Sequence, residues 1–285
     1  MSRVQCLPIG EGDSMNEVEN ATGAMVMRVL NADWPVGEAI RPNQLQADLG
    51  VIPNIAEQVR HVAIRMGLFK GKSGAGSLVQ PQDQWNHRDP ELVRWMLAHN
   101  YDVTIRRLLE VREAIEPIAA AHAARRSCED AREIALLAER IDALGSVDPH
   151  QFAENRDQFG ATDVLFHTRI LTASGNPFFA ADATNVKLAL EHRLQRCAPP
   201  SRGRVVGTAS YYPEQPAEIA MIMHIGLAKA ICQELPDAAE AMARGIVVEF
   251  NPGHGTPDLT RRLQLAADQI AWGSYQHRAR PEVWV

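Results

Sequence analysis

Two side chains that commonly bind divalent metals, Asp163 and His167, stand four residues apart in the segment 160–177. Apolar residues recur there mostly three or four positions apart, which predicts a helix. The final run Ser174-Gly175-Asn176-Pro177 ends that helix, because Gly and Asn suit a left-handed cap and Pro cannot continue it. Residues four apart share one helix face. The pair therefore forms either half of a metal site or an ordinary hydrogen bond within the helix.

The composition is that of a folded soluble protein. The chain has 285 residues, of which 46% are hydrophobic and 22% charged, and this length favours two domains. It contains no run of about 18 apolar residues, so we expect no membrane-spanning helix, and we expect no signal peptide at its start. The four scattered cysteines favour free thiols and a cytoplasmic location. The net charge of −6 restricts any nucleic-acid binding to a local surface.

The first third of the chain has the pattern of a small DNA-binding fold. Three amphipathic segments predict helices at residues 21–32, 42–49 and 53–66. A Gly-rich stretch, residues 68–79, predicts two strands around a turn. Three short helices followed by a β-hairpin form a winged helix-turn-helix, which we place at residues 21–80. Residues 1–20 are expected to be a flexible lead-in.

The remainder of the chain has helical periodicity throughout. The predicted helices cover residues 101–126, 128–144, 149–172, 177–197, 217–235 and 237–250. Short loops between long helices favour an antiparallel all-α bundle, so the expected fold is mainly α. We place a linker at residues 81–90, the bundle at 91–250, and a C-terminal extension at 251–285. The extension contains one more predicted helix at 257–272.

Motifs in both parts resemble known domains. Pro35-Val36-Gly37-Glu38-Ala39-Ile40, Leu45-Gln46-Ala47-Asp48-Leu49-Gly50-Val51, Met66-Gly67-Leu68-Phe69 and Gly74-Ala75-Gly76-Ser77-Leu78-Val79 resemble the DNA-binding domain of GntR-family bacterial transcription regulators. Glu110-Val111-Arg112-Glu113-Ala114-Ile115-Glu116-Pro117 and Asp163-x-x-Phe166-His167 resemble the FCD effector domain of the FadR-type branch. The resemblance covers about residues 21–80 and 90–246. It implies a DNA-binding homodimer that responds to a ligand. The sequence contains no motif placed for catalysis, so we do not expect an enzyme.

The recognition helix lacks the arginines that the family uses. Members read Ser-Arg-x-x-Val-Arg-Glu-Ala-Leu there, whereas residues 51–59 contain no arginine. Pro53 and Glu57 stand at the arginine positions in the ungapped register, and Ile52 and Ala56 stand there when the register is shifted by one residue. The remaining candidates for DNA contact are Asn43, Gln44, Asn54, Gln58, Arg60, His61, Arg65, Lys70 and Lys72. Residues 21–90 carry seven Lys and Arg against six Asp and Glu, a net +1. Either DNA binding is retained with unusual specificity, or the domain keeps its fold and has lost that binding.

The resemblance also implies a divalent metal held by one aspartate and three histidines. Asp163, His167 and His224 match three of these ligands, whereas Gly245 and Ile246 stand where the fourth histidine is expected. Such ligands suit zinc, nickel or manganese. The ligand set is incomplete, but three protein ligands with water or a bound acid make a plausible site. The alternative is a hydrogen-bonded Asp163–His167 pair with a buried His224.

Two further residues are candidates for effector binding. Arg112 resembles an inward-pointing arginine of the family that would pair with the carboxylate of an effector; the alternative is a surface salt bridge with Glu116. Asn176 either lines the pocket or caps a helix. We therefore predict a transcriptional regulator whose operator binding responds to a small carboxylate. The alternative is a small-molecule or metal sensor that acts through protein contacts, with the winged domain as a dimerisation module.

Overall fold

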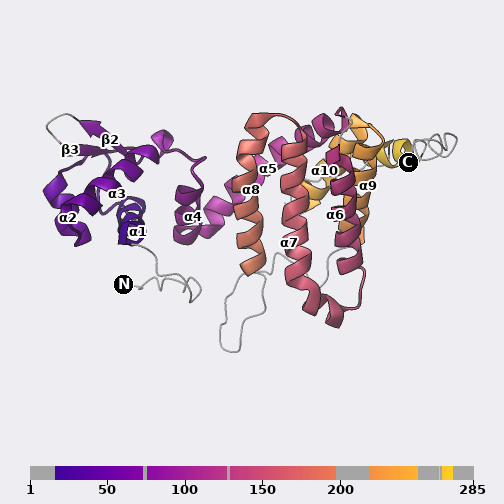
Figure 1. Cartoon of the computed structure of the whole chain (residues 1–285), viewed down its shortest axis with the longest axis horizontal. Helices are drawn as coiled ribbons and strands as arrows, with labels where there is room; N and C mark the ends of the chain where they lie inside the picture. Colours follow the sequence, from indigo (N-terminus) through magenta and orange to yellow (C-terminus); the bar gives the residue numbers. More distant parts are fainter. Residues whose placement is uncertain are drawn as a thin grey trace. The chain divides into compact units, whose positions relative to one another are not determined.

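The computed structural model describes residues 17–72, 76–126, 129–196, 218–249, 263 and 265–271. The chain divides into two compact units at the Tyr101–Asp102 bond, and each unit is described by itself (Figure 1). No helix within the described ranges combines the length and hydropathy needed to cross a bilayer. Of the predicted lead-in, residues 17–20 are already helical and the rest lies outside the described residues.

The N-terminal unit has the predicted winged-helix order. Its elements are α1 (Glu17–Leu30), β1 (Ala39–Ile40), α2 (Pro42–Leu49), α3 (Pro53–Arg65), β2 (Phe69–Lys72), β3 (Gly76–Val79), the 3-10 helix η1 (Gln82–Gln84) and α4 (Pro90–His99). Helices α2 and α3 both begin with proline, whose fixed φ suits the first helical turn and whose missing N–H leaves no bond unmade. Gly50, at φ 66°, ends α2 in the left-handed region. The prediction of a mainly α fold with a winged helix-turn-helix is confirmed.

The wing is a three-stranded antiparallel sheet with the order β1-β3-β2. In the predicted hairpin, Phe69 faces Val79 across β2 and β3. Strand β1 was not predicted, and its Ile40 pairs with Ser77 of β3. Only two residues form this strand, too few to show an alternating pattern in the sequence.

A single apolar cluster holds the N-terminal unit together. Val26 of α1 and Val59 of α3 are fully buried in it, and α1 also packs against α4. Leu92 and Met96 of α4 join the same cluster. The structure therefore groups α4 with the N-terminal unit, whereas the sequence placed residues from 91 onward in the bundle domain.

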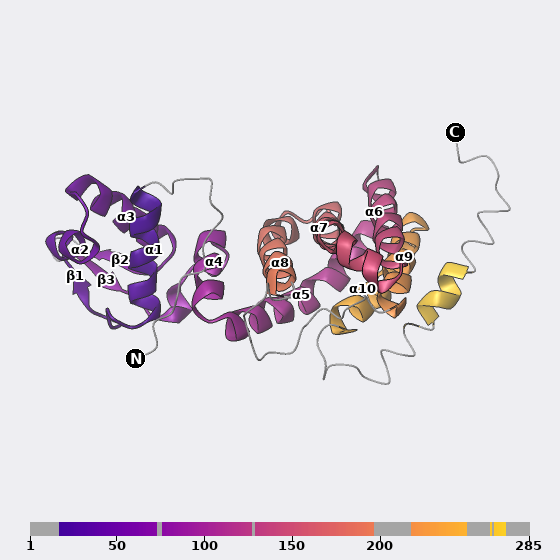
Figure 2. The same cartoon turned by 90° about the horizontal axis from the view of Figure 1, so that it is seen from below.

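The C-terminal unit is an all-α bundle, also as predicted. Its helices are α5 (Tyr101–Ala124), α6 (Glu129–Gly145), α7 (Pro149–Ala173), α8 (Pro177–Arg196), α9 (Glu218–Cys232) and α10 (Pro236–Glu249). Helix α7 packs against α6 and α8, α6 also packs against α9, and α9 packs against α10. Figures 1 and 2 show α5 running crosswise to α7 and α8. The long α7 begins at the cap of Asp148, whose carboxylate accepts the backbone N–H groups of His150 and Gln151.

Part of the C-terminal extension belongs to the bundle core. The structure describes only residues 263 and 265–271 of the helix predicted at 257–272, and these are helical. Ala266 and Ile270 are buried in the same apolar cluster as the bundle helices. A Cβ placed on Gly245 of α10 would lie 2.9 Å from Cδ2 of Leu263 and 2.5 Å from Sδ of Met223. The extension thus packs where the fourth histidine ligand was expected.

Two glycines with the same backbone conformation provide a test of packing in the N-terminal unit. Gly67, at φ 73°, has no room for a side chain because an added Cβ would lie 2.4 Å from the carbonyl oxygen of Gln84. Gly50, at φ 66°, has nothing within 4 Å of that position. We expect Gly50→Ala to cost about 1–2 kcal/mol through the left-handed conformation alone. Gly67→Ala should cost about 1–3 kcal/mol more through the clash.

Urea unfolding followed by tryptophan fluorescence measures both free energies. Equal losses for the two variants would contradict the close contact between Gly67 and the η1 segment.

Candidate functional site

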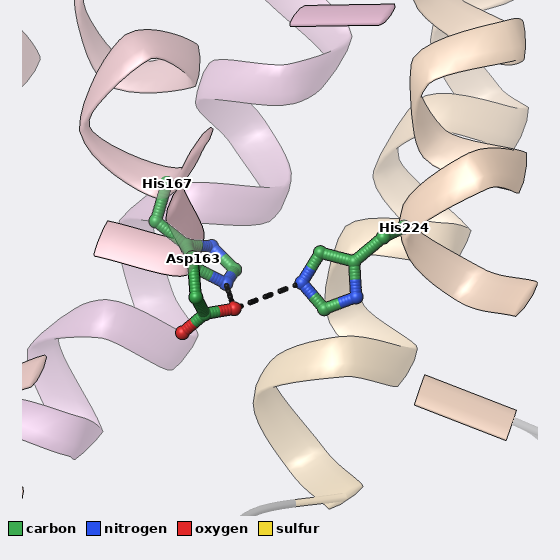
Figure 3. A group of neighbouring side chains, drawn as sticks. All are labelled: Asp163, His167 and His224. Carbon is green, nitrogen blue, oxygen red and sulfur yellow. Dashed lines mark hydrogen bonds and ion pairs between the residues drawn. The ribbon is translucent and has the colours of Figure 1, made fainter. Parts of the chain in front are cut away.

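Three potential metal ligands meet inside the C-terminal bundle. Oδ1 of Asp163 lies 3.5 Å from Nε2 of His167 and 3.2 Å from Nε2 of His224 (Figure 3). All three side chains are buried, and their donor atoms lie within 4.8 Å of one another. The structure therefore brings together the three residues that the sequence singled out as metal ligands.

The bundle positions these side chains from two helices. Asp163 and His167 lie one turn apart on α7, and His224 lies on α9. Phe166 packs against both histidines, with its ring centroid 5.5 Å from that of His167 and 5.0 Å from that of His224, and the two histidine rings contact each other with their centroids 5.4 Å apart. Close apolar packing around the site leaves these side chains no room to turn away from one another.

Behind His167 stands a buried ion pair. Oε2 of Glu116 on α5 lies 2.8 Å from Nδ1 of His167. Arg112, one turn earlier on α5, donates from Nε to the same carboxylate, and its Nη2 donates to Oε2 at 3.4 Å. The sequence left two alternatives for Arg112, an inward-pointing arginine that binds the effector or a surface salt bridge with Glu116; the structure shows the salt bridge with Glu116, buried and not on the surface. Because both side chains are buried, that pair is part of the core and touches the site.

The site strongly favours ionised carboxylates. Burial raises the pKa of Asp163, but the adjacent His167 and His224 outweigh it and hold that pKa well below its ordinary value. Burial likewise opposes ionisation of Glu116, yet Arg112 and His167 lower its pKa. For His167, burial and Arg112 disfavour the charge, whereas Glu116 and Asp163 raise the pKa above its ordinary value.

The distances fit a divalent ion. Zinc bonds to N and O donors are about 2.0–2.2 Å long, so tetrahedral ligands stand about 3.4 Å apart. The 3.5 Å and 3.2 Å separations around Asp163 match this edge. Nδ1 of His167 faces Oε2 of Glu116 at 2.8 Å, whereas Nε2, on the side of Asp163 and His224, makes no hydrogen bond with good geometry. A buried nitrogen of this kind is suited to bind a metal ion.

The other predicted pocket residues have partners of their own. Arg112 pairs with Glu116, and Oδ1 of Asn176 accepts the N–H of Phe178 as the cap of α8. At the expected fourth ligand, Ile246 is buried and apolar. Within the described ranges, Asp163, His167 and His224 are the one group of three or more such side chains that could hold a metal ion.

The predicted DNA contacts lie in the N-terminal unit. The exposed ones at which a side chain is described are Asn43, Asn54, Gln58, His61, Arg65 and Lys70. Gln44 is half-buried and donates to Glu38 at 3.2 Å, and Arg60 is also half-buried. The side chain of Lys72 lies outside the described part. The α3 face is therefore polar and accessible at Asn54, Gln58 and His61.

Acidic residues hold the basic groups of α3. Glu57 accepts from Nε of Arg60 at 2.8 Å and lies 3.0 Å from Nε2 of His61. The hydrogen bond from Arg60 lowers the pKa of Glu57. Arg65 pairs with Asp89 at 3.2 Å and with Glu91 at 2.8 Å. The three- and four-residue spacing of Glu57 to Arg60 and His61 is that of helical ion pairs, so these contacts could be expected from the sequence.

A winged helix followed by an all-α bundle with a buried donor cluster is the architecture of a two-domain transcription regulator. Residues 107–248 match the FCD domain family. The galactonate operon transcriptional repressor of Escherichia coli (strain K12) is 30% identical over 166 residues, which are 58% of this chain and 69% of that protein. The chain belongs to the GntR family of transcription regulators, with an FCD domain in its C-terminal part.

Two other comparisons are more distant. The uncharacterized HTH-type transcriptional regulator YieP of Escherichia coli (strain K12) is 26% identical, over 56% of this chain and 68% of that protein. The solved structure of a Streptococcus agalactiae GntR protein is 18% identical and covers 81% of this chain and 97% of its own, with a TM-score of 0.41.

In metal-free protein, the raised pKa of His167 makes stability depend on pH. The folded-state pKa lies above the ordinary 6.5, so the stabilisation is fully present below that value and is lost as the pH rises through the folded-state pKa. We expect His167→Gln to cost more stability at about pH 6 than at about pH 9. Urea unfolding in a chelator measures this difference, with the exposed His150→Gln on α7 as control. A cost that does not change with pH would contradict the shift.

Proposed function

We propose that the protein binds operator DNA as a homodimer and that a small carboxylate, bound at a divalent metal in the FCD domain, controls this binding. The observation that carries the effector half is the buried convergence of Asp163, His167 and His224. Membership of a family of transcription regulators supports the DNA-binding half. A zinc, nickel or manganese ion held by these three residues would supply an open position for an acid ligand.

The charge of the site supports a carboxylate. Arg112 and Glu116 cancel each other, and Asp163 leaves a charge of −1 when both histidines are neutral. A divalent cation would bring the total to +1, which favours an anion in a buried site. One relative is named as a repressor of a galactonate operon, and galactonate is a small hydroxylated carboxylate. This supports the same class of effector for this chain.

The coupling of the two halves requires two conformations of the protein with different affinities for the effector. A ligand shifts such an equilibrium only by its differential affinity, which typically corresponds to about 5–150-fold in the coupled binding. Paired winged helices in a dimer would read two half-sites, so a change in their spacing would change operator affinity. The proposed effector contacts of Arg112 and Asn176 stay predictions.

A second function has a specific observation in its favour. In the ungapped register Glu57 stands at a position where the family places an arginine, and it contacts both Arg60 and His61. A glutamate in place of an arginine on the recognition helix weakens attraction to phosphates. The alternative is therefore a metal or small-molecule sensor that acts through protein contacts, with the winged domain serving dimerisation.

Operator binding separates these two functions. We expect the full chain to form a specific complex with the region upstream of its own operon, and raising the salt concentration should weaken it. Asn54→Ala and Gln58→Ala, on the exposed face of α3, should each lose about 1–3 kcal/mol of discrimination if they contact base edges. Gln82→Ala, exposed in η1, is the matched control and should bind as the wild type does.

Fluorescence anisotropy with specific and scrambled duplexes measures these affinities. Equal affinity for both duplexes, or none for either, would favour the sensor that acts through protein contacts.

A further inference from the structure

His167, one of the three proposed ligands, has a carboxylate at each of its ring nitrogens. Oε2 of Glu116 lies 2.8 Å from Nδ1, and Oδ1 of Asp163 lies 3.5 Å from Nε2. The ring is fully enclosed, with 1% of His167 exposed. The nitrogen that retains the proton is therefore decided by these neighbours and not by water.

The shorter contact selects the tautomer. A proton on Nδ1 would face the carboxylate of Glu116, whereas a lone pair on Nδ1 would face its negative charge at 2.8 Å. A neutral His167 therefore keeps its proton on Nδ1 and presents the lone pair of Nε2 to Asp163 and His224. That is the side on which the three donor atoms converge.

Arg112 offsets the cost of burying the charge of Glu116 beside His167. An isolated carboxylate in the core would be neutralised by protonation, because burial disfavours its charge. Nε and Nη2 of Arg112 both donate to Glu116 from one turn away, and 1% of Arg112 is exposed. A buried ion pair is a weak source of stability compared with apolar packing. Its contact with a proposed ligand gives the pair a role at the site.

We propose that Glu116 is the positioning residue that fixes His167 for metal binding through Nε2, and that Arg112 serves this carboxylate and not the effector. The inference deepens the metal site proposed above and rests on it. It reassigns Arg112: its charge neutralises Glu116, and the effector carboxylate binds at the metal. Carboxylates that hold metal-binding histidines from behind typically contribute about 10–100-fold to metal affinity.

Zinc affinity of the full chain tests the role of Glu116. Competition with a fluorescent chelator should show that Glu116→Gln binds Zn²⁺ about 10–100-fold more weakly than the wild type. Glu240→Gln is the matched control, since it removes the carboxylate of another Arg–Glu pair with i,i+4 spacing, Glu240–Arg244 on α10. The control should bind as the wild type does. Unchanged affinity in Glu116→Gln overturns the proposal.

A double variant tests the reassignment of Arg112. If Arg112 acts only through Glu116, then Arg112→Gln combined with Glu116→Gln should bind Zn²⁺ as weakly as Glu116→Gln alone. A further loss of more than about fivefold would show an independent role for Arg112 and overturn that part.

The tautomer of His167 can be measured directly in the wild-type protein. Long-range ¹H–¹⁵N correlations of the zinc-loaded wild type should show His167 protonated at Nδ1 and bound to metal through Nε2. Metal on Nδ1 would overturn the proposal even if the Glu116 variants failed to fold. Wild-type protein that binds no Zn²⁺ would refute both the metal site and this inference. If the wild type binds Zn²⁺ and Glu116→Gln binds it with the same affinity, the inference alone is refuted.

Discussion

The arrangement of the C-terminal unit depends on the contact between one buried carboxylate and two imidazoles. Asp163 faces His167 across one helical turn and His224 across the interior of the bundle. Burial alone would neutralise such a carboxylate, so its ionised form requires the cationic or metal-bound partners that surround it. The buried carboxylate of Glu116 also needs partners: it contacts His167, and Arg112 neutralises its charge. A chain of buried polar contacts thus links α5, α7 and α9.

Much of the fold was predictable from the sequence, because long helices leave strong periodic signals. The bundle helices and the hairpin follow directly from apolar spacing and from glycine or proline at element ends. Strand β1 was missed because two residues show no period. Helical periodicity identifies an apolar face without identifying its partner, so it did not show that Leu92 of α4 joins the apolar cluster of the N-terminal unit.

The sequence identified the residues of the candidate site but not the contacts that surround them. Asp163 and His167 were identified by spacing, and His224 by family resemblance. The resemblance predicted an inward-pointing Arg112, but not that it pairs with a buried Glu116, since an i,i+4 pair has the same sequence pattern on a surface and in a core. Packing of Leu263 against Gly245 was also invisible, because it joins α10 to a segment beyond the FCD match. In the N-terminal unit, Glu57 pairs with Arg60 and His61, two side chains that the sequence alone offers as DNA contacts.

The metal content of the full chain tests the central claim most directly. Purified protein is incubated with Zn²⁺, freed of excess metal and measured by elemental analysis, beside Asp163→Ala and the exposed Asp157→Ala on the same helix. Wild type and Asp157→Ala should retain about one ion per chain, because three ligands with a fourth from solvent complete a tetrahedral site. Asp163→Ala should retain much less. Equal zinc in wild type and Asp163→Ala, or none in any of the three proteins, would contradict the account.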